Sequence, residues 1–301
     1  MTHLAWNCRG AGGSLRSSTM VHLSRLLLST KTQVCFISET RNSSISSSSI
    51  KNHFNYNDAF VVPSIGQSGG LWLIWSDEVD VSIVGHHHHY IFALCTNKAS
   101  HLQYGLVCVY GDPHHRQSSV IWNRVLHFVN LNANLPILCM GDFNDIMHAS
   151  EKLGPYAADV ARISEFCGFI KQCGFFDLGY SGPAYTWTNK RFSSVHTYQR
   201  IDRCLGNAEW CLAFPSTAIY HLPMMYSDHA PILATLNSQR PRLSKPFRFE
   251  NWWLMDKDYH HIAQTSWNKS SNRVFSQKLK FLAADLKKWR KSKPKNTDLL
   301  A

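Results

Sequence analysis

The sequence lacks long hydrophobic runs and any mark of export. No stretch approaches the roughly 18 consecutive apolar residues that a membrane-spanning helix needs. The N-terminal MTHLAWNCRG has no charged segment followed by an apolar one, so it does not resemble a secretory signal. We therefore expect an intracellular protein that is not secreted and has no membrane partner.

Paired cysteines are also missing. The nine cysteines form no CxxC pair, and several lie inside apolar runs such as VCFI, LVCVY and ILCMG. This usage, with an odd count, is typical of reduced and buried thiols that act as small hydrophobic side chains. The pattern does not indicate a disulfide framework.

Net charge is nearly absent from most of the chain. Residues 1–239 contain 16 Lys and Arg and 15 Asp and Glu, whereas residues 240–301 contain 15 and 5, and the whole carries +11. The basic character therefore belongs to a tail. Such a tail either contacts a phosphate backbone or is a solvated linker face.

The first 237 residues alternate between short strand-like runs and a few helical ones. The expected helices, which repeat apolar residues at helical spacing, are Ser17–Ser29, Ser119–Leu131 and Asp159–Cys173, the last capped by Asp159. The expected strands are His3–Cys8, Val34–Ser38, Gly70–Trp75, Val79–Val84, Ile91–Thr96, Leu102–Tyr110, Pro136–Met140, Tyr185–Thr188, Arg200–Leu205, Ala218–His221 and Ala230–Leu236. Many strands with few helices indicate two sheets packed face to face and covered outside by helices.

Two polar segments interrupt this pattern. Asn42–Ser49 (NSSISSSS) is expected to be a surface loop. His86–His89 invites a metal-site interpretation, but it lies between two expected strands, where consecutive side chains point to opposite faces. Four such histidines do not converge on one ion, so we expect an exposed turn.

A boundary is expected after residue 238, which divides the chain into 1–238 and a basic segment, 239–301. Gln239–Glu250 is rich in Pro and Arg, as linkers are. Beyond it an amphipathic helix is expected, with apolar residues stepping by four, three, four and three at Phe275, Leu279, Leu282, Leu286 and Trp289. Its apolar stripe leaves three interpretations. The helix docks on the first domain, it docks on a partner, or the chain is a truncated form of a longer protein.

Polar residues with catalytic potential follow several of the expected strands, where the loops of a sheet usually build a site. In GDFN, Asp142 and Asn144 lie two residues apart and so on one side of an extended backbone. The carboxylate suits a metal or an incoming water, and the amide suits a phosphoryl oxygen. The other residues of this kind are Asn7, Glu39, Tyr110, Asp228 and His229.

The order WN, E, Y, GDFN, SDH resembles the endonuclease/exonuclease/phosphatase superfamily from about Leu4 to Leu236. This resemblance implies an α+β fold, a four-layer α/β/β/α sandwich of two mainly antiparallel sheets. WNCRGAG, ISET, YTWTN and RIDRCL are closest to endonuclease domains of plant LINE-type non-LTR retrotransposons. FRFENWW and KFLAADLKKWRK resemble the segment that joins such a domain to a reverse transcriptase.

The resemblance assigns roles to these residues. Glu39 is the principal Mg²⁺ ligand, with Mn²⁺ as a substitute, and Asn7 and Asp228 assist it. Asp142 orients or deprotonates the attacking water, and Asn144 binds a phosphate oxygen. His229 contacts the phosphate or shares the acid–base work.

Three further assignments carry alternatives. Asp202 fixes the tautomer of His229, or it is an ordinary salt-bridge partner of Arg200 or Arg203. Tyr110 hydrogen-bonds the phosphate, or it is plain core. Arg116 reaches the DNA backbone, or the DPHHRQ loop leaves it in solvent.

One position departs from the wider superfamily. Many abasic-site nucleases have an acidic residue two positions after the first Asn, where this chain has Arg9. The leading hypothesis is a nuclear Mg²⁺-dependent DNA endonuclease that nicks one strand, with RNA or a reverse transcriptase as further partners. The alternatives are a catalytically silent nucleic-acid-binding remnant and a phosphatase or lipid phosphodiesterase.

Overall fold

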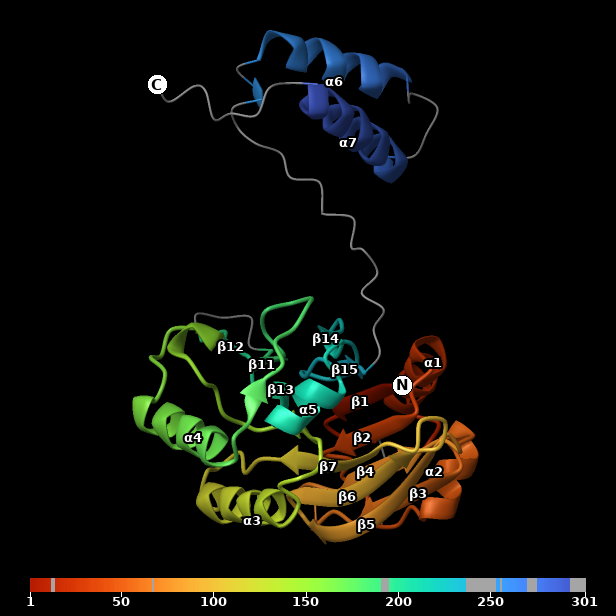
Figure 1. Ribbon diagram of the computed structural model, residues 1–301, viewed down its shortest axis with the longest axis vertical. Helices are drawn as coiled ribbons and strands as arrows, with labels where there is room; N and C mark the ends of the chain where they lie inside the picture. The colour runs from red at the N-terminus through yellow and green to blue at the C-terminus, as the bar shows by residue number, and fades with distance from the viewer. Residues whose placement is uncertain are drawn as a thin grey trace. The chain divides into compact units, whose positions relative to one another are not determined.

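The computed structural model describes residues 1–11, 14–66, 68–190, 195–236, 253–254, 256–269 and 275–292. The chain divides into two compact units, Met1–Gln239 and Arg240–Ala301 (Figure 1). Each unit is described separately below.

The first sheet of unit one has six strands in the order β14-β15-β1-β2-β4-β3. Strands β1 and β2 are parallel, and the other neighbours are antiparallel. The strands are β1 (Thr2–Asn7), β2 (Val34–Ser38), β3 (Asp58–Val62), β4 (Leu71–Trp75), β14 (Ala218–His221) and β15 (Ile232–Thr235).

The second sheet repeats this plan in the order β10-β13-β8-β7-β6-β5, with β7 and β8 parallel. Its strands are β5 (Val79–His87), β6 (Tyr90–Asn97), β7 (Gln103–Tyr110), β8 (Ile137–Asp142), β10 (Phe176–Asp177) and β13 (Asp202–Gly206). A small sheet joins β9 (Lys152–Leu153), β12 (Tyr198–Gln199) and β11 (Trp187–Thr188).

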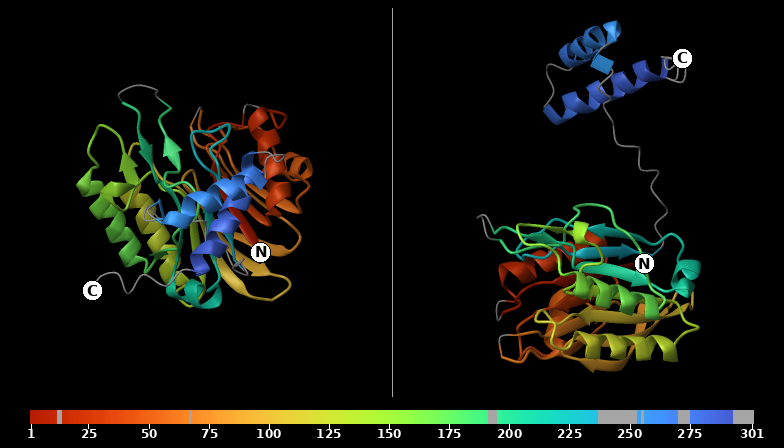
Figure 2. Two further views of the ribbon diagram at one scale, coloured as in Figure 1. Left: turned by 90° about the horizontal axis from the view of Figure 1, so that it is seen from above. Right: turned by 90° about the vertical axis from the view of Figure 1, so that its left-hand side faces the viewer.

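Three hydrophobic layers hold unit one together. Residues of both sheets, such as Phe36 and Leu106, form the core between them. The outer face of the first sheet packs under α1 (Ser18–Thr30) and α2 (Ser47–Phe54), and that of the second under α3 (Ser118–Leu131) and α4 (Val160–Gln172) (Figure 2). This confirms the four-layer α/β/β/α sandwich of mainly antiparallel sheets. The short helix α5 (Ala208–Ala213) follows β13.

Side-chain caps set where the helices begin. Asp159 accepts hydrogen bonds from the backbone N–H groups of Ala161 and Arg162, and so caps α4. The prediction of a loop over 42–49 is wrong for its last residues, because α2 begins at Ser47. Ser46 caps this helix by accepting a hydrogen bond from the N–H of Ser49. Burial of Ile50 and Phe54 stabilises this helix against the sheet despite its polar first turn.

The histidine run forms a hairpin tip. His86 and His87 end β5, the turn follows at His88, and these three side chains are exposed. The His87 ring stacks on that of His89, which also stacks on Tyr110, whereas the His86 ring lies against Phe60 of β3. No metal-ligand cluster among the described residues includes these histidines.

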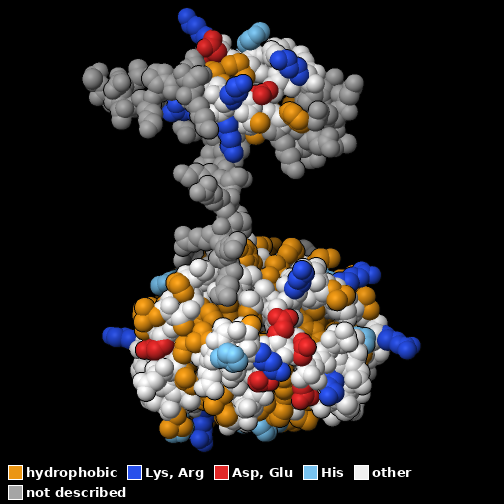
Figure 3. Space-filling model, turned by 45° about the vertical axis from the view of Figure 1, so that its right-hand side comes forward, with side chains coloured by type: hydrophobic (Ala, Val, Ile, Leu, Met, Phe, Trp, Pro, Cys, Tyr) orange, Lys and Arg blue, Asp and Glu red, His pale blue; other side chains and the backbone are white. Residues whose placement is uncertain are grey.

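Unit two contains α6 (Lys257–Lys269) and α7 (Phe275–Ser292). The apolar stripe of α7 packs within the unit, where Trp253, Leu286 and Trp289 are buried against Tyr259 and Ile262 of the α6 region. The stripe thus has a partner in its own unit, whereas Gln239–Glu250 lies outside the described residues. On the face in Figure 3, acidic and basic side chains are interspersed on unit one, and basic ones predominate in unit two. No described helix has the length and apolar character needed to cross a bilayer.

Candidate active site

The site lies where the two parallel strand pairs end. Asn7 ends β1, Tyr110 ends β7 and Asp142 ends β8, with Tyr110 and Asp142 in register. Glu39 follows β2 directly. Asn7 Nδ2 donates to Asp142 Oδ2 at 2.9 Å, and this bond joins the end of one sheet to that of the other.

Glu39 is the acceptor at the centre of one half of the site. Its Oε1 accepts from Asn7 Nδ2 and from the Tyr110 hydroxyl, both at 3.0 Å, and its Oε2 accepts from Arg41 Nη2 at 2.8 Å. Burial disfavours the carboxylate, but these donors and the nearby His229 outweigh it and lower the pKa of Glu39. Burial, reinforced by the negative charge of Glu39, raises the pKa of Tyr110, so its hydroxyl stays a donor.

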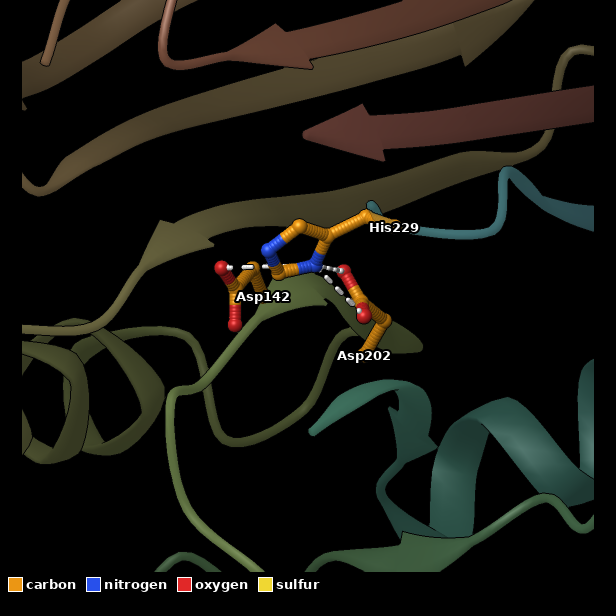
Figure 4. A group of neighbouring side chains, drawn as sticks. All are labelled: Asp142, Asp202 and His229. Atoms are coloured by element: carbon orange, nitrogen blue, oxygen red, sulfur yellow. Dashed lines mark hydrogen bonds and ion pairs between the residues drawn. The ribbon is translucent and has the colours of Figure 1, made fainter. Parts of the chain in front are cut away.

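The other half is a buried group of one imidazole and two carboxylates (Figure 4). His229 Nδ1 lies 3.0 Å from Asp202 Oδ2 and 3.8 Å from Asp142 Oδ2. Asp202 and Asp142 are register partners on β13 and β8, which are antiparallel. The Thr186 hydroxyl accepts from the Asp202 N–H at 3.0 Å, and Ser227 Oγ accepts from the His229 N–H at 3.1 Å.

Two members of this group, Asp142 and His229, hold their protons more tightly than free side chains do. Burial and the negative charge of Asp202 raise the pKa of Asp142, against the opposing effect of His229. Burial alone disfavours a charged imidazole, but the charges of Asp202 and Asp142 reverse that effect and raise the pKa of His229. A cationic imidazole beside an accepting carboxylate suits acid–base work on a phosphate ester.

Asp228, next to His229, faces the same cavity. Its Oδ2 accepts from Trp187 Nε1 at 3.1 Å and is ion-paired with Arg9. Trp187, Asp228, His229 and Glu39 are among the residues that line a cavity of about 320 Å³. The site is therefore an open hollow with a buried acidic floor and arginines at its mouth.

The end of β8 and the loop after it lie close against the end of β7. Gly141 has φ +140°, and a Cβ there would lie 2.0 Å from the carbonyl oxygen of Val109, so only glycine fits. Asn144 has φ +54°, and its side-chain N–H group donates to the Gly111 carbonyl at 2.9 Å. Its backbone N–H donates to Asp142 Oδ1 at 2.9 Å, which orients that carboxylate.

The structure thus brings together eight of the residues predicted from the sequence, namely Asn7, Glu39, Tyr110, Asp142, Asn144, Asp202, Asp228 and His229. Arg116 is the exception: it is exposed after β7 and pairs with no described side chain, while Pro113 and His115 line the cavity. Tyr110 belongs to the core and to the site, because its ring is buried and its hydroxyl reaches Glu39.

The alternative partners of Asp202 are engaged elsewhere. Arg200 and Arg203 both pair with Glu151 and Asp177, at 2.7 to 2.8 Å. Neither arginine pairs with Asp202, whose carboxylate contacts His229 instead. Pattern reasoning missed Arg41 and the contact of Trp187, although Arg41 stands two residues after Glu39 and Trp187 belongs to YTWTN.

The donor set at the cavity fits a hard divalent cation. Glu39 and Asp228 present carboxylate oxygens there, each already paired with one positive charge. Asn7 fits less directly, since its Oδ1 accepts from the Arg9 N–H at 3.1 Å and its Nδ2 faces the carboxylates. Asp142, Asp202 and His229 also lie close enough to hold an ion, but the direct hydrogen bond between His229 and Asp202 favours proton sharing.

The fold and this site define a phosphodiesterase-type hydrolase. Residues 4–229 match the family model "Endonuclease/Exonuclease/phosphatase family", and the chain belongs to that family.

Similar solved structures share its fold. The AP endonuclease LMAP from Leishmania major has a TM-score of 0.62 and 13% identity over 77% of this chain and 86% of its own. The endonuclease domain of TRAS1, a telomere-specific non-LTR retrotransposon, has 0.58 and 15% over 79% and 99%. The 3′-5′ exonuclease NExo from Neisseria meningitidis has 0.58 and 15% over 79% and 100%. No curated protein sequence matches the chain.

Proposed function

We propose that this chain is a Mg²⁺-dependent DNA endonuclease that nicks one strand, and that it derives from a LINE-type retrotransposon. The observation that carries the proposal is the continuous network from Glu39 through Asn7 to Asp142 and His229, whose two ends, Glu39 and His229, line one cavity. The likeness of the fold to the TRAS1 endonuclease domain and the LINE-like motifs support the origin.

In this proposal the chain's own residues divide the work of hydrolysis. Asp142, which Asn7 and the Asn144 N–H hold in place, accepts the proton of the attacking water. The bond from the water oxygen to phosphorus forms as the bond from phosphorus to the 3′-oxygen breaks. The 3′-oxygen takes up a proton from solvent, so the products are a 3′-hydroxyl and a 5′-phosphate.

His229, oriented by Asp202, contacts a phosphate oxygen, and Tyr110 fixes Glu39. Asn7 positions Glu39 and Asp142 through its Nδ2. Its Oδ1 accepts one hydrogen bond, from the Arg9 N–H, and keeps a lone pair with which it would assist in holding the ion. A Mg²⁺ ion held by Glu39 and Asp228 would neutralise charge on the scissile phosphate and on the leaving oxygen, and Mn²⁺ would substitute. DNA is the proposed substrate, and a reverse transcriptase module or RNA is a proposed partner in a longer element.

Nicking of supercoiled plasmid tests the proposal. We expect nicked circles in Mg²⁺ or Mn²⁺, none with chelator, and ends that a polymerase extends without phosphatase treatment. Glu39→Gln should abolish nicking, whereas Glu165→Gln, a matched change at an exposed position of α4, should not. DNA retained but uncut by the parent would instead support the silent remnant, and release of phosphate from an inositol phosphate would support a phosphatase.

A further inference from the structure

Two arginines form ion pairs with the carboxylates that the proposed function assigns to the metal. Arg41 Nη2 lies 2.8 Å from Glu39 Oε2, and Arg9 Nη1 pairs with Asp228 Oδ2. The Asp228 side chain is buried, at 1% exposed, and that of Glu39 is partly buried, at 16%, but the side chains of Arg9 and Arg41 are 52% and 36% exposed. Each acid of the cavity is thus paired with a cation that can move into solvent.

The backbone holds both arginines in this place. Arg9 and Arg41 have φ of +49° and +52°, in the left-handed region that non-glycine residues rarely adopt. Their two loops adjoin: the Ala11 N–H donates to the Thr40 carbonyl at 2.8 Å, and a Cβ on Gly10 would lie 3.7 Å from Arg41 Cδ. Unusual backbone that the surroundings enforce at a site is a reason to look for function there.

A structural role explains these pairs poorly. Half-exposed ion pairs contribute little to stability, because solvent screens them and the side chains lose entropy. Their positions are better explained by the acids, since neighbouring buried carboxylates need a compensating positive charge. A divalent cation supplies that charge more compactly, and its binding leaves both guanidinium groups at the mouth of the cavity.

We infer that Arg9 and Arg41 are placeholder cations, which pair with Asp228 and Glu39 when metal is absent and bind nucleic-acid phosphates when it is present. This inference rests on the proposed function. Guanidinium groups suit the second task, because their donors match two oxygens of one phosphate. Metal and nucleic acid then bind with positive coupling, since each favours the state in which the arginines have left the carboxylates.

The test measures binding rather than cleavage, in an Asp142→Asn background that leaves DNA intact. Mn²⁺ binding is measured by calorimetry, and binding of a short duplex by fluorescence anisotropy with Mn²⁺ or with EDTA. Arg9→Gln and Arg41→Gln should each tighten Mn²⁺ binding by about twofold to fivefold, as loss of a competing half-exposed ion pair implies. Each should also reduce the gain in DNA affinity that Mn²⁺ brings, and lower the salt dependence by about one phosphate contact in Mn²⁺ but not in EDTA.

Arg25→Gln, at an exposed position of α1, is the matched control and should change none of these values. Unchanged or weaker Mn²⁺ binding in both arginine variants, with melting temperatures like that of the parent, would overturn the inference. Glu39→Gln and Asp228→Asn separate this outcome from failure of the metal site. If they bind Mn²⁺ as the parent does, the proposed site is wrong; if they lose Mn²⁺ while the arginine variants bind it normally, only the placeholder role fails.

Discussion

Two buried ionic groups flank the same strand, β13, and they differ in balance. Asp177 and Glu151 share two arginines, Arg200 and Arg203, of which the second is fully buried. On the site side, Asp202 and Asp142 share the single imidazole of His229. When all side chains are ionised, the group with the two arginines is neutral. The group with the single imidazole then carries excess negative charge.

The pKa values follow this difference. Burial disfavours the carboxylates of Glu151 and Asp177, but their arginines outweigh it and lower both pKa values. For Asp142, burial and a neighbouring acid win, and its pKa is raised. A buried group whose charges balance is a structural joint, that is, a set of ion pairs that holds elements of the fold together. A group with excess negative charge is a site for binding cations and transferring protons.

The largest expected effect separates the two groups by activity. Asp142→Asn should reduce plasmid nicking about 1,000-fold, since removal of a general base costs 10² to 10⁴. Folding stability should hold or rise, because the change relieves repulsion between neighbouring acids. Single-turnover nicking and urea unfolding measure the two quantities. A variant that unfolds more easily would show that this group is a structural joint as well.

Asp177→Asn should do the reverse. It leaves two buried arginines with one carboxylate, so we expect a loss of about 3 kcal/mol in the free energy of unfolding. Urea unfolding measures this, with Asp77→Asn, an exposed change in the turn before β5, as the matched control. At low temperature, where the variant is folded, nicking should stay within about threefold of the parent. A larger loss of nicking would mean that the joint positions Asp202.

The acidic residues of the site were largely predictable from the sequence. The ion pairs of Arg200 and Arg203 were not. Asn7, Glu39, Asp142 and His229 stand in a recognisable order beside strand-like runs, so their convergence could be expected. The partners of Arg200 and Arg203 come from positions 151 and 177, and no periodicity links them. Such pairing depends on how the sheets and loops pack.

The shortest strands and the directions of some side chains could not be predicted from the sequence, for related reasons. Strands β9 and β12 have two residues each, too few to show an alternation. The amide of Asn7 turns its nitrogen to the acids because Arg9 offers a backbone N–H on the other side, which only the folded loop reveals. Helix α2 was hidden by its serines, one of which is its cap.

The contact between Asp202 and His229, within the buried half of the site, gives a smaller effect. Asp202→Asn keeps a hydrogen-bond partner for His229 but removes the charge that orients its ring and favours its cationic form. We expect nicking to fall about 10-fold to 100-fold, as for loss of a residue that orients a catalytic histidine. Single-turnover rates measure the chemical step, and DNA affinity should change less than the rate. An equal fall in both would indicate a general loss of structure.

A second buried histidine, His3, is the counterpart of His229 without carboxylates, and it gives the smallest effect. Its Nε2 lies 2.8 Å from the Tyr104 hydroxyl, and burial, with the nearby N-terminal charge, lowers its pKa to about 3. The unfolded chain binds a proton near pH 6.5 and the folded one does not, so this contribution to stability is complete above pH 6.5 and declines as the pH falls toward 3. Between pH 7.5 and pH 5 we expect His3 to account for about 2 kcal/mol of lost stability. Urea unfolding of His3→Gln should show a decline smaller by that amount, and an unchanged decline would place the acid sensitivity elsewhere.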